Sequence, residues 1–219
     1  LFSNANCAAE MKLSSHENTS SRLSMIFLVS SVKMLSSSAG MSRVFSAAAA
    51  RRHIFSRRSL QGLYLGGGYP ELYAAQLEEN AALRGQIREA VHAEMPCIAE
   101  CGGFMYLTQS IAGRAMVGAL PGDCFDTGRL TRFGYITATA QSDNLLCRAG
   151  EEIPMHEFHR WDTPLPGSAF AARKPSGRQW RCAYATDTLY AGYPHVHFYA
   201  APAMAARFLA ACRRRKEML

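Results

Sequence analysis

The sequence predicts an α/β fold in which a parallel or mixed sheet is flanked by helices in three layers. Short apolar runs at residues 63–65 and 96–99 are typical of buried strands, and each precedes a segment with helical periodicity. Glycines at 66–68 end the first run, as expected for a tight loop after a strand. Because strand and helix patterns alternate, we expect the strands to pair in parallel and the helices to cover them.

The remaining elements follow from the same periodicities. Residues 71–92 and 102–111 carry apolar side chains at helical spacing, and residues 135–140 alternate as a half-buried strand does. Two further strands are expected at 180–184 and 189–192, and a closing amphipathic helix at 203–212. Together these elements predict a folded domain over residues 61–219.

Residues 1–60 have a different composition, rich in Ser, Ala and Arg, with Glu10 and Glu17 as the acidic residues. This composition is typical of an organelle transit peptide or of a poorly ordered segment. The apolar patch at residues 25–29 is too short to span a membrane. We therefore predict that residues 1–60 are disordered or transit-like and that a domain boundary follows them.

The chain is basic, with a formal net charge of +7 from 24 Lys and Arg and 17 Asp and Glu residues. The charge is scattered, and its densest run, residues 213–216, suits the C-terminal dipole of a last helix. We therefore predict no nucleic-acid partner. No apolar run reaches the roughly 18 residues that a span needs, so we predict no membrane association. A cytoplasmic location is expected, with organelle targeting by the N-terminal segment as the alternative.

The seven cysteines have irregular spacing and form no C-x-x-C pair of the zinc-binding type. We expect them to be reduced and mostly buried, and we predict no metal site.

Cys101 differs from the other cysteines. The segment Glu100-Cys101-Gly102-Gly103 follows a predicted strand and opens a predicted helix, which is the arrangement of a nucleophile elbow. Glycines permit the tight turn, the start of a helix favours a thiolate, and free amides there can receive an oxyanion. The alternative is a buried cysteine beside a helix cap.

A cysteine hydrolase needs a base, usually a histidine. His195 and His197 lie in an extended stretch before the last predicted helix, and a spacing of two points both rings to one side of a strand. Either ring could face Cys101; the alternative is that both are ordinary strand histidines. The glycine loop at 66–68 could supply a second oxyanion donor, because it ends a strand at the same sheet edge.

The chain contains four motifs, given below in the order in which they occur. A further segment, Arg132-Phe133-Gly134-Tyr135, lies between the second and the third. The four motifs are Gly66-Gly67-Gly68-Tyr69-Pro70-Glu71-Leu72, Ala99-Glu100-Cys101-Gly102-Gly103-Phe104-Met105-Tyr106-Leu107, His156-Glu157-Phe158-His159 and Tyr193-Pro194-His195-Val196-His197-Phe198. With these motifs, residues 62–213 resemble the glutaminase domain of the cobyrinic acid and hydrogenobyrinic acid a,c-diamide synthases, a family of cobalamin biosynthesis. The resemblance implies a class I-like glutamine amidotransferase fold.

The resemblance implies that Cys101 is the nucleophile and His195 its base, with Gly67, Gly68 and Gly102 forming the oxyanion hole and glutamine site. Further residues expected in the pocket or behind the catalytic groups are Glu100, His156, His159 and His197. Many class I glutaminases carry a glutamate where this chain has His197. The usual third member of the triad is therefore expected to be absent, and the group that orients His195 is left open.

The stretch from His156 to His159 is not the H-E-x-x-H zinc motif, because its histidines are three residues apart. In a strand, His156 and Phe158 would share one face, with Glu157 and His159 on the other. We expect these side chains to line a pocket or to pack in the core.

The resemblance also implies the reaction and the partners. Cys101 would form a glutamyl thioester from glutamine and release ammonia to a synthetase domain. That domain would use ATP and Mg²⁺ to amidate the a and c carboxylates of a corrinoid. The glutaminase domain itself is expected to bind no cofactor, and a homodimer is compatible with the sequence.

The chain departs from the family in its first residues. It contains no G-x-x-x-x-G-K-[ST] phosphate loop, so the synthetase domain is expected to be missing. Residues 1–60 do not resemble the leading strands of the glutaminase domain, so we expect a truncated sheet in which the strand at 63–65 has an unpaired edge. The alternatives are a cobyric acid synthase-like enzyme or another amidotransferase of this superfamily and, from a different class, a non-catalytic remnant or interaction module.

Overall fold

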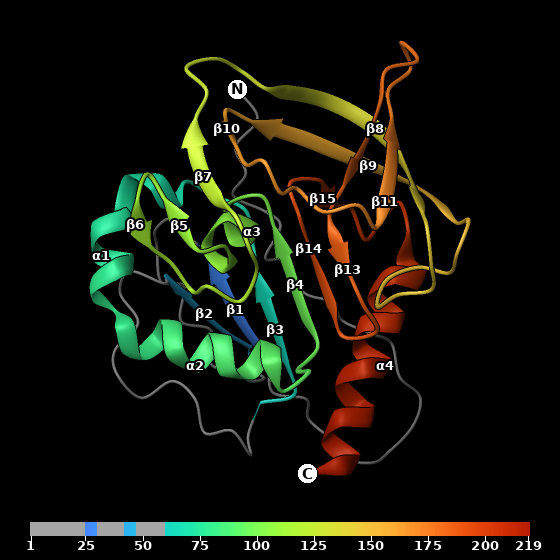
Figure 1. Cartoon of the computed structure of the whole chain (residues 1–219). Helices are drawn as coiled ribbons and strands as arrows, with labels where there is room; N and C mark the ends of the chain where they lie inside the picture. Colours follow the sequence, from blue (N-terminus) through green and yellow to red (C-terminus); the bar gives the residue numbers. More distant parts are fainter. Residues whose placement is uncertain (1–24, 30–41, 47–59) are drawn as a thin grey trace.

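The computed structural model describes residues 25–29, 42–46 and 60–219 and is built around a six-stranded sheet (Figure 1). The strand order is β13-β14-β4-β3-β1-β2, and within this sheet only β13 is antiparallel to its neighbour. The strands are β1 (Met25–Val29), β2 (Ser42–Ser46), β3 (Gly62–Leu65), β4 (Cys97–Glu100), β13 (Tyr184–Ala185) and β14 (Leu189–Gly192).

The two faces of this sheet pack against different layers, and β4 shows the division. Cys97 and Ala99 belong to a core formed with the helices η1 to α3, whereas Ile98 between them belongs to a core formed with α4 and a second sheet. Figure 1 shows α1 and α2 on one side of the sheet and α4 on the other. The helices are η1 (Pro70–Tyr73), α1 (Ala74–Glu79), α2 (Ala81–His92), α3 (Gly102–Leu107) and α4 (Pro202–Met218).

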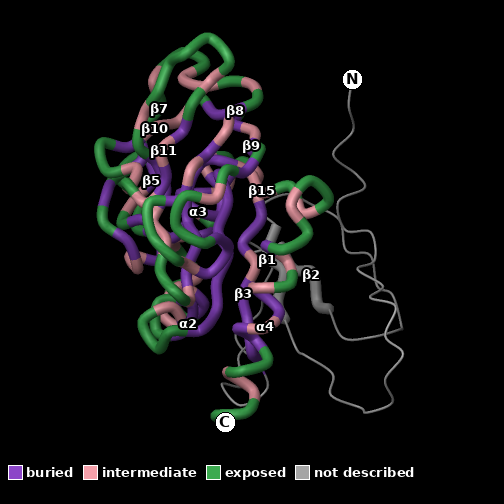
Figure 2. Tube along the Cα trace, turned by 90° about the vertical axis from the view of Figure 1, so that its right-hand side faces the viewer, coloured by how far each residue is buried: buried purple, intermediate pink, exposed green. Residues whose placement is uncertain are grey.

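The second sheet is antiparallel, has five strands and covers part of the face that α4 also covers. Its order is β12-β11-β8-β9-β15, and the strands are β8 (Arg132–Ala140), β9 (Glu152–His159), β11 (Phe170–Arg173), β12 (Gln179–Cys182) and β15 (His195–Val196). A small sheet, β10-β7-β5-β6, consists of β5 (Ser110–Ile111), β6 (Arg114–Ala115), β7 (Asp123–Asp126) and β10 (Trp161–Asp162). In Figure 2 the buried residues follow the strands through the middle of the molecule.

The prediction of an α/β fold with parallel strands flanked by helices is confirmed, but the prediction of missing leading strands is wrong. β1 pairs in parallel with β3, and β2 pairs in parallel with β1, at the edge expected to be unpaired. The apolar patch 25–29 is too short for a membrane span, yet five residues are a usual strand length. The rest of residues 1–59 lies outside the described residues, and the domain boundary near residue 60 stays a prediction.

The helix predicted at 71–92 is divided into η1, α1 and α2. The break falls at Asn80, whose side chain accepts a hydrogen bond from the amide of Leu83 and caps α2. The helix predicted at 102–111 ends at Leu107, because the hydroxyl of Thr108 bonds back to the carbonyl of Met105 and Thr108 is extended. In both places a polar side chain ends a helix within a segment whose apolar residues continue at helical spacing.

The six described cysteines are free and buried, as predicted.

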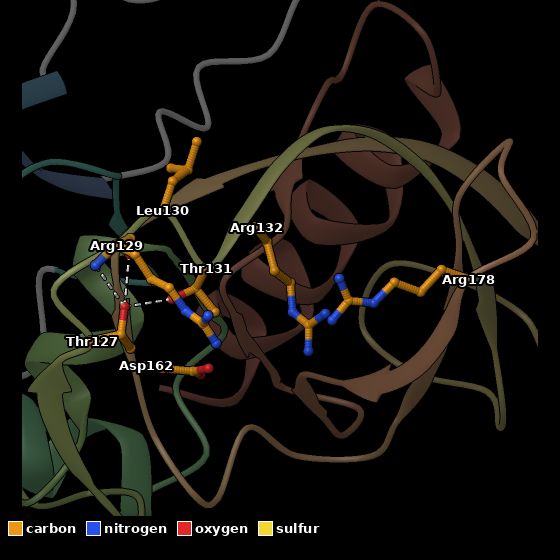
Figure 3. Close-up of a pocket in the computed structure, with 7 residues that line it drawn as sticks. All are labelled: Thr127, Arg129, Leu130, Thr131, Arg132, Asp162 and Arg178. Carbon is orange, nitrogen blue, oxygen red and sulfur yellow. Dashed lines mark hydrogen bonds between the residues drawn. The ribbon is translucent and has the colours of Figure 1, made fainter.

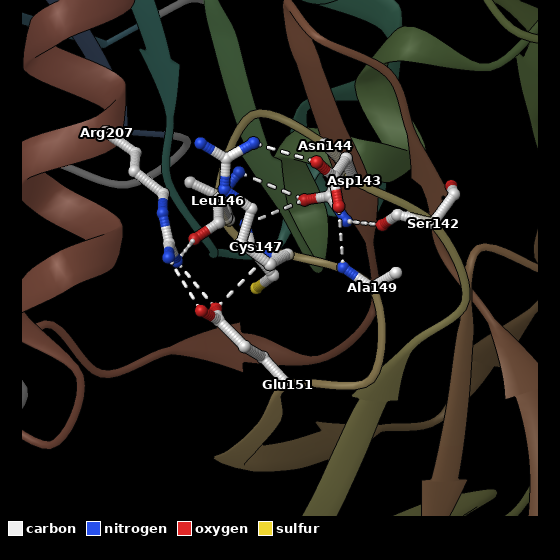
Figure 4. A network of polar contacts seen from close by, with 9 residues as sticks. Ser142, Asp143, Asn144, Leu146, Cys147, Ala149, Glu151 and Arg207 are labelled. Atoms are coloured by element: carbon white, nitrogen blue, oxygen red, sulfur yellow. Dashed lines mark hydrogen bonds and ion pairs between the residues drawn. The ribbon is translucent and has the colours of Figure 1, made fainter.

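The C-terminal helix is fixed to the second sheet by a polar network (Figure 4). Both guanidinium nitrogens Nη1 and Nη2 of Arg207 bond the carboxylate of Glu151 at 2.6 Å, and Nη1 also bonds the carbonyl of Leu146 at 2.9 Å. Asp143 and Asn144 hold the loop between β8 and β9 through its backbone amides. The predicted closing helix is therefore present, and it is longer than predicted at both ends.

Among the described residues no helix has both the length and the apolar character that crossing a bilayer requires.

Replacing Gly103 with alanine is expected to destabilise the fold. A Cβ atom there would lie 2.1 Å from the carbonyl oxygen of Leu65 on β3, so α3 would have to move away from the central sheet. Overpacking of this kind costs about 1–3 kcal/mol in the free energy of unfolding. The change is measured by urea unfolding followed by circular dichroism.

Gly85→Ala is the matched control for this test. Gly85 lies within α2, and nothing stands within 4 Å of the added Cβ. Since alanine is a better helix former, this variant is expected to gain about 0.5–1 kcal/mol. Equal stability of the Gly103→Ala variant and the wild type would contradict the close packing of α3 on β3.

Candidate active site

Cys101 lies at the carboxyl end of β4, immediately before α3. Its backbone has φ 46° and ψ −105°, a strained left-handed conformation for a residue other than glycine. Two hydrogen bonds hold this turn: the amide of Cys101 donates to Gly192 O at 2.8 Å, and the amide of Met105 donates to Cys101 O at 2.9 Å. The strained turn at the end of a strand is the geometry predicted for a nucleophile elbow.

His195 on β15 is brought to the same end of the central sheet. A Cβ atom on Gly67 would lie 2.5 Å from Cε1 of the His195 ring, so only a glycine leaves room for the imidazole there. Burial lowers the pKa of His195, but its contacts with the Cys101 sulfur and the Glu100 carboxylate raise it, and the resulting pKa is about 10. The imidazole therefore carries its proton at neutral pH beside the sulfur of Cys101.

Glu100 is the group that stands behind His195. Its carboxylate is buried, and Oε2 lies 3.5 Å from Nδ1 of His195. The carboxylate is held in place by the hydroxyl of Tyr64, at 2.9 Å, and by the amide of Val196, at 2.8 Å. Because Nδ1 faces Glu100, Nε2 is the ring nitrogen left for the sulfur. The group beside His195, which the sequence left open, is thus the carboxylate of the residue that precedes Cys101.

The three glycines predicted for the oxyanion hole, Gly67, Gly68 and Gly102, lie close to Cys101 and His195. A Cβ on Gly102 would lie 2.5 Å from Gly68 O and 2.8 Å from Cδ of Pro70, so the glycine loop packs directly against the start of α3. Gly102 is the first residue of α3, and an amide at that position has no partner within the helix. Gly67 contacts the His195 ring. The structure therefore brings Gly67, Gly68 and Gly102 together beside Cys101.

His197 does not share a strand face with His195. β15 ends at Val196, and His197 begins a turn in which its exposed side chain accepts a hydrogen bond from the amide of Ala200 at 3.2 Å. The expectation that both rings point to one side is wrong, because the extended stretch ends after two residues. The period-two rule applies only while the strand continues.

His156 and His159 lie on opposite faces of β9, as the alternation predicts. His156 is paired with His195 across β9 and β15, and their ring centroids are 6.2 Å apart. His159 is buried and stacks on Tyr193 at 3.9 Å, with Nδ1 2.7 Å from Trp161 O. Burial lowers the pKa of His159 to about 4, so its ring is neutral. His156 thus lies near His195, and His159 is a core residue.

An exposed aromatic surface adjoins His156 on β8 and β9. It consists of Phe133, Tyr135 and Phe158, which are 56%, 78% and 46% exposed. The rings of Phe133 and Phe158 are 5.6 Å apart, and those of Tyr135 and His156 are 5.5 Å apart. The carbonyl of Phe158 lies 3.9 Å from Sγ of Cys101, so this aromatic surface borders the candidate nucleophile.

The sequence reasoning missed Tyr64 and assigned Glu100 no specific role. The sequence does contain a signal for Glu100. This charged residue ends an otherwise apolar buried strand, and a buried charge needs polar or charged partners. Tyr64 is one strand away, in β3, and only the parallel register of β3 and β4 places its hydroxyl beside Glu100.

The chain matches the model of the CobB/CobQ-like glutamine amidotransferase domain over residues 27–203. It is 36% identical over 160 residues to a cobyrinate a,c-diamide synthase of Caldanaerobacter subterraneus, covering 69% of this chain and 35% of that protein. It is 40% identical over 164 residues to the enzyme of the same name from Salmonella typhimurium, covering 70% of this chain and 36% of that protein. The chain thus spans about a third of the length of these curated relatives.

The fold agrees with solved structures of low sequence identity. A PurLQS structure from Thermotoga maritima has a TM-score of 0.56 at 11% identity, with 88% of this chain and 98% of that chain covered. The family match begins at residue 27, within β1, so it extends further toward the N-terminus than the resemblance seen at residues 62–213. The chain belongs to the CobB/CobQ-like glutamine amidotransferase domain family.

Proposed function

We propose that this chain hydrolyses glutamine with Cys101 as nucleophile, His195 as general acid and base, and Glu100 as the group that orients His195. The observation that carries the proposal is the convergence of these three side chains at the carboxyl end of β4, with the sulfur on a strained turn. In a parallel sheet this end is where ligands bind.

The reaction has two steps. The sulfur of Cys101 attacks Cδ of glutamine; the S–C bond forms, the C–N bond breaks, and His195 gives its proton to the departing ammonia. The amides near Gly68 and Gly102 receive the negative charge that develops on the amide oxygen. His195 then takes a proton from water as the water attacks the thioester, the S–C bond breaks, and glutamate leaves.

The ammonia goes to an acceptor in a synthetase domain, in this proposal the ATP- and Mg²⁺-dependent domain that amidates the a and c carboxylates of a corrinoid. Two facts support this partner: relatives named cobyrinate a,c-diamide synthase are about three times as long as the matched region, and an exposed aromatic surface borders Cys101. Phe133, Tyr135 and Phe158 would be covered by that domain, because exposed aromatic clusters mark interfaces. The glutaminase domain needs no cofactor of its own for thioester chemistry.

The proposal is tested by measuring glutamate released from glutamine by the purified chain, with and without a synthetase domain taken from the Salmonella relative. We expect glutamate release, and faster release when the synthetase domain, ATP and the corrinoid substrate are present. A chain that binds the synthetase domain but releases no glutamate under either condition would favour a non-catalytic role.

A further inference from the structure

A cavity of about 480 Å³ lies at the start of β8, apart from the catalytic groups (Figure 3). The residues that line it are Thr127, Arg129, Leu130, Thr131, Arg132, Asp162 and Arg178. Neither Cys101, Glu100 nor His195 is among them. Its size falls within the range of roughly 300–1,000 Å³ that is usual for small-molecule sites.

The charges around this cavity are unbalanced. Three arginines and one aspartate line it, which leaves an excess of two positive charges. Within the part of the chain that the structure describes, no carboxylate forms an ion pair with Arg129, Arg132 or Arg178, although six other basic side chains have such partners. Like charges held together without a counter-charge destabilise a fold, and an anion would relieve that cost.

Arg132, at the start of β8, and Arg178, in the turn before β12, meet beside one aromatic ring. The Cζ atoms of Arg132 and Arg178 lie 4.2 and 6.0 Å from the ring centroid of Trp180. Figure 3 shows the two side chains extending toward each other from opposite sides of the cavity. The guanidinium group of Arg132 stacks on the indole, and this contact orients its N–H groups before a ligand arrives.

The buried carboxyl of Glu157, whose pKa responds to Arg132, neutralises these arginines only in part. Glu157 is 1% exposed, and its Oε2 atom has no hydrogen-bond partner among the described residues. Burial raises the pKa of Glu157 to about 7, although Arg132 lowers it. At neutral pH this carboxyl is therefore only partly ionised, and the arginines keep an excess of positive charge.

The loop beside the arginines is already formed. The hydroxyls of Thr127 and Thr131 each lie within hydrogen-bond distance of Arg160 O, at 2.7 and 3.0 Å, and the amide of Thr131 donates to His159 O. A binding site built on a fixed loop loses less conformational entropy when a ligand binds.

The cavity lies on the face of the second sheet opposite His156. Arg132 pairs with His159 across β8 and β9, and the side chains of His159 and His156 lie on opposite faces of β9.

We propose that this cavity binds a small molecule carrying a dianionic group, a phosphate or a pair of carboxylates, between Arg132 and Arg178. Guanidinium groups bind both chemistries through paired N–H donors, and two negative charges match the excess of two positive charges. The two chemistries have different sources, because a phosphate would come from a nucleotide or a phosphorylated intermediate and a dicarboxylate from an organic acid. The proposal does not depend on glutamine hydrolysis.

The test is isothermal titration of the full chain with sodium phosphate and, separately, with sodium succinate, at an ionic strength kept constant with sodium chloride. We expect saturable binding of at least one dianion, and its affinity should fall about 10-fold or more in the Arg178→Gln variant, as is usual for a lost charged hydrogen bond. Arg178 lies in an exposed turn, so its replacement leaves the core unchanged. The preferred dianion identifies the source.

Arg181→Gln is the matched control. Arg181 is exposed on β12 and does not line the cavity, and its replacement removes the same charge from the same strand region. This variant should bind the dianion as the wild type does. The absence of saturable binding in the wild type, or equal loss in the Arg178→Gln and Arg181→Gln variants, would overturn the proposal.

Discussion

Replacement of Cys101 with alanine is expected to reduce glutamate release from glutamine by a factor on the order of 10⁴ or more, because removal of the nucleophile eliminates the thioester route. The fold should survive the change. Cys101 is 7% exposed and its backbone is held by two hydrogen bonds that do not involve the sulfur. The measurement is glutamate formation over time by the wild type and the variant at equal concentration, with circular dichroism to verify folding.

Cys97→Ala is the matched control for the loss of a thiol. Cys97 lies on the same strand, β4, and is fully buried in the core. Its thiol pKa is raised to about 12 by burial and by Cys212, so Cys97 is not a nucleophile at neutral pH. This variant should lose some stability and keep its activity. Activity that survives in the Cys101→Ala variant would show that another residue performs the attack.

Replacement of Glu100 with glutamine is expected to reduce kcat by roughly 10²- to 10⁴-fold, as removal of the carboxylate behind a catalytic histidine does in other triads. Glutamine keeps the size of the side chain but removes the charge beside Nδ1 of His195. The KM for glutamine should change little, because the carboxylate faces His195, Tyr64 and Val196. Steady-state kinetics of glutamate release measure both constants.

The pH profile separates an orienting role from a structural one. The carboxylate of Glu100 is one of the groups that raise the pKa of His195, so its replacement should lower that pKa. The imidazole must carry a proton to give it to ammonia, so activity falls as pH rises through the pKa of His195. This alkaline decline should therefore begin at lower pH in the Glu100→Gln variant.

Glu79→Gln is the control for this prediction, because Glu79 is exposed on α1 and distant in sequence from the catalytic groups. It should leave both kcat and the pH profile unchanged. An unchanged kcat in the Glu100→Gln variant would show that the imidazole of His195 needs no carboxylate behind it.

The elements that sequence patterns predicted well are those with strong local signals. The strand–turn–helix around Cys101 was predictable because an apolar run, a cysteine and two glycines occupy consecutive positions. The parallel pairing of β3 and β4 followed from the alternation of strands and helices. Family motifs then assigned roles to Cys101 and His195, and the structure places both at one end of β4.

The features that were missed depend on contacts between residues far apart in the sequence. β1 and β2 lie in a segment whose composition favoured disorder, and they become strands through pairing, β1 with β3 and β2 with β1. Tyr64 meets Glu100 through strand register. The arginine cavity brings together residues 129, 132 and 178, which no local pattern connects. Local rules predict elements well, whereas such long-range contacts become visible only in three dimensions.

The most direct test of the account is covalent labelling with a glutamine analogue that carries a chloromethyl ketone in place of the amide, followed by peptide mass spectrometry. We expect one label per chain, on Cys101, with glutamine slowing its formation. A label that forms on other cysteines instead, or one on Cys101 that glutamine does not slow, would contradict the assignment of this sulfur as the glutamine-attacking group.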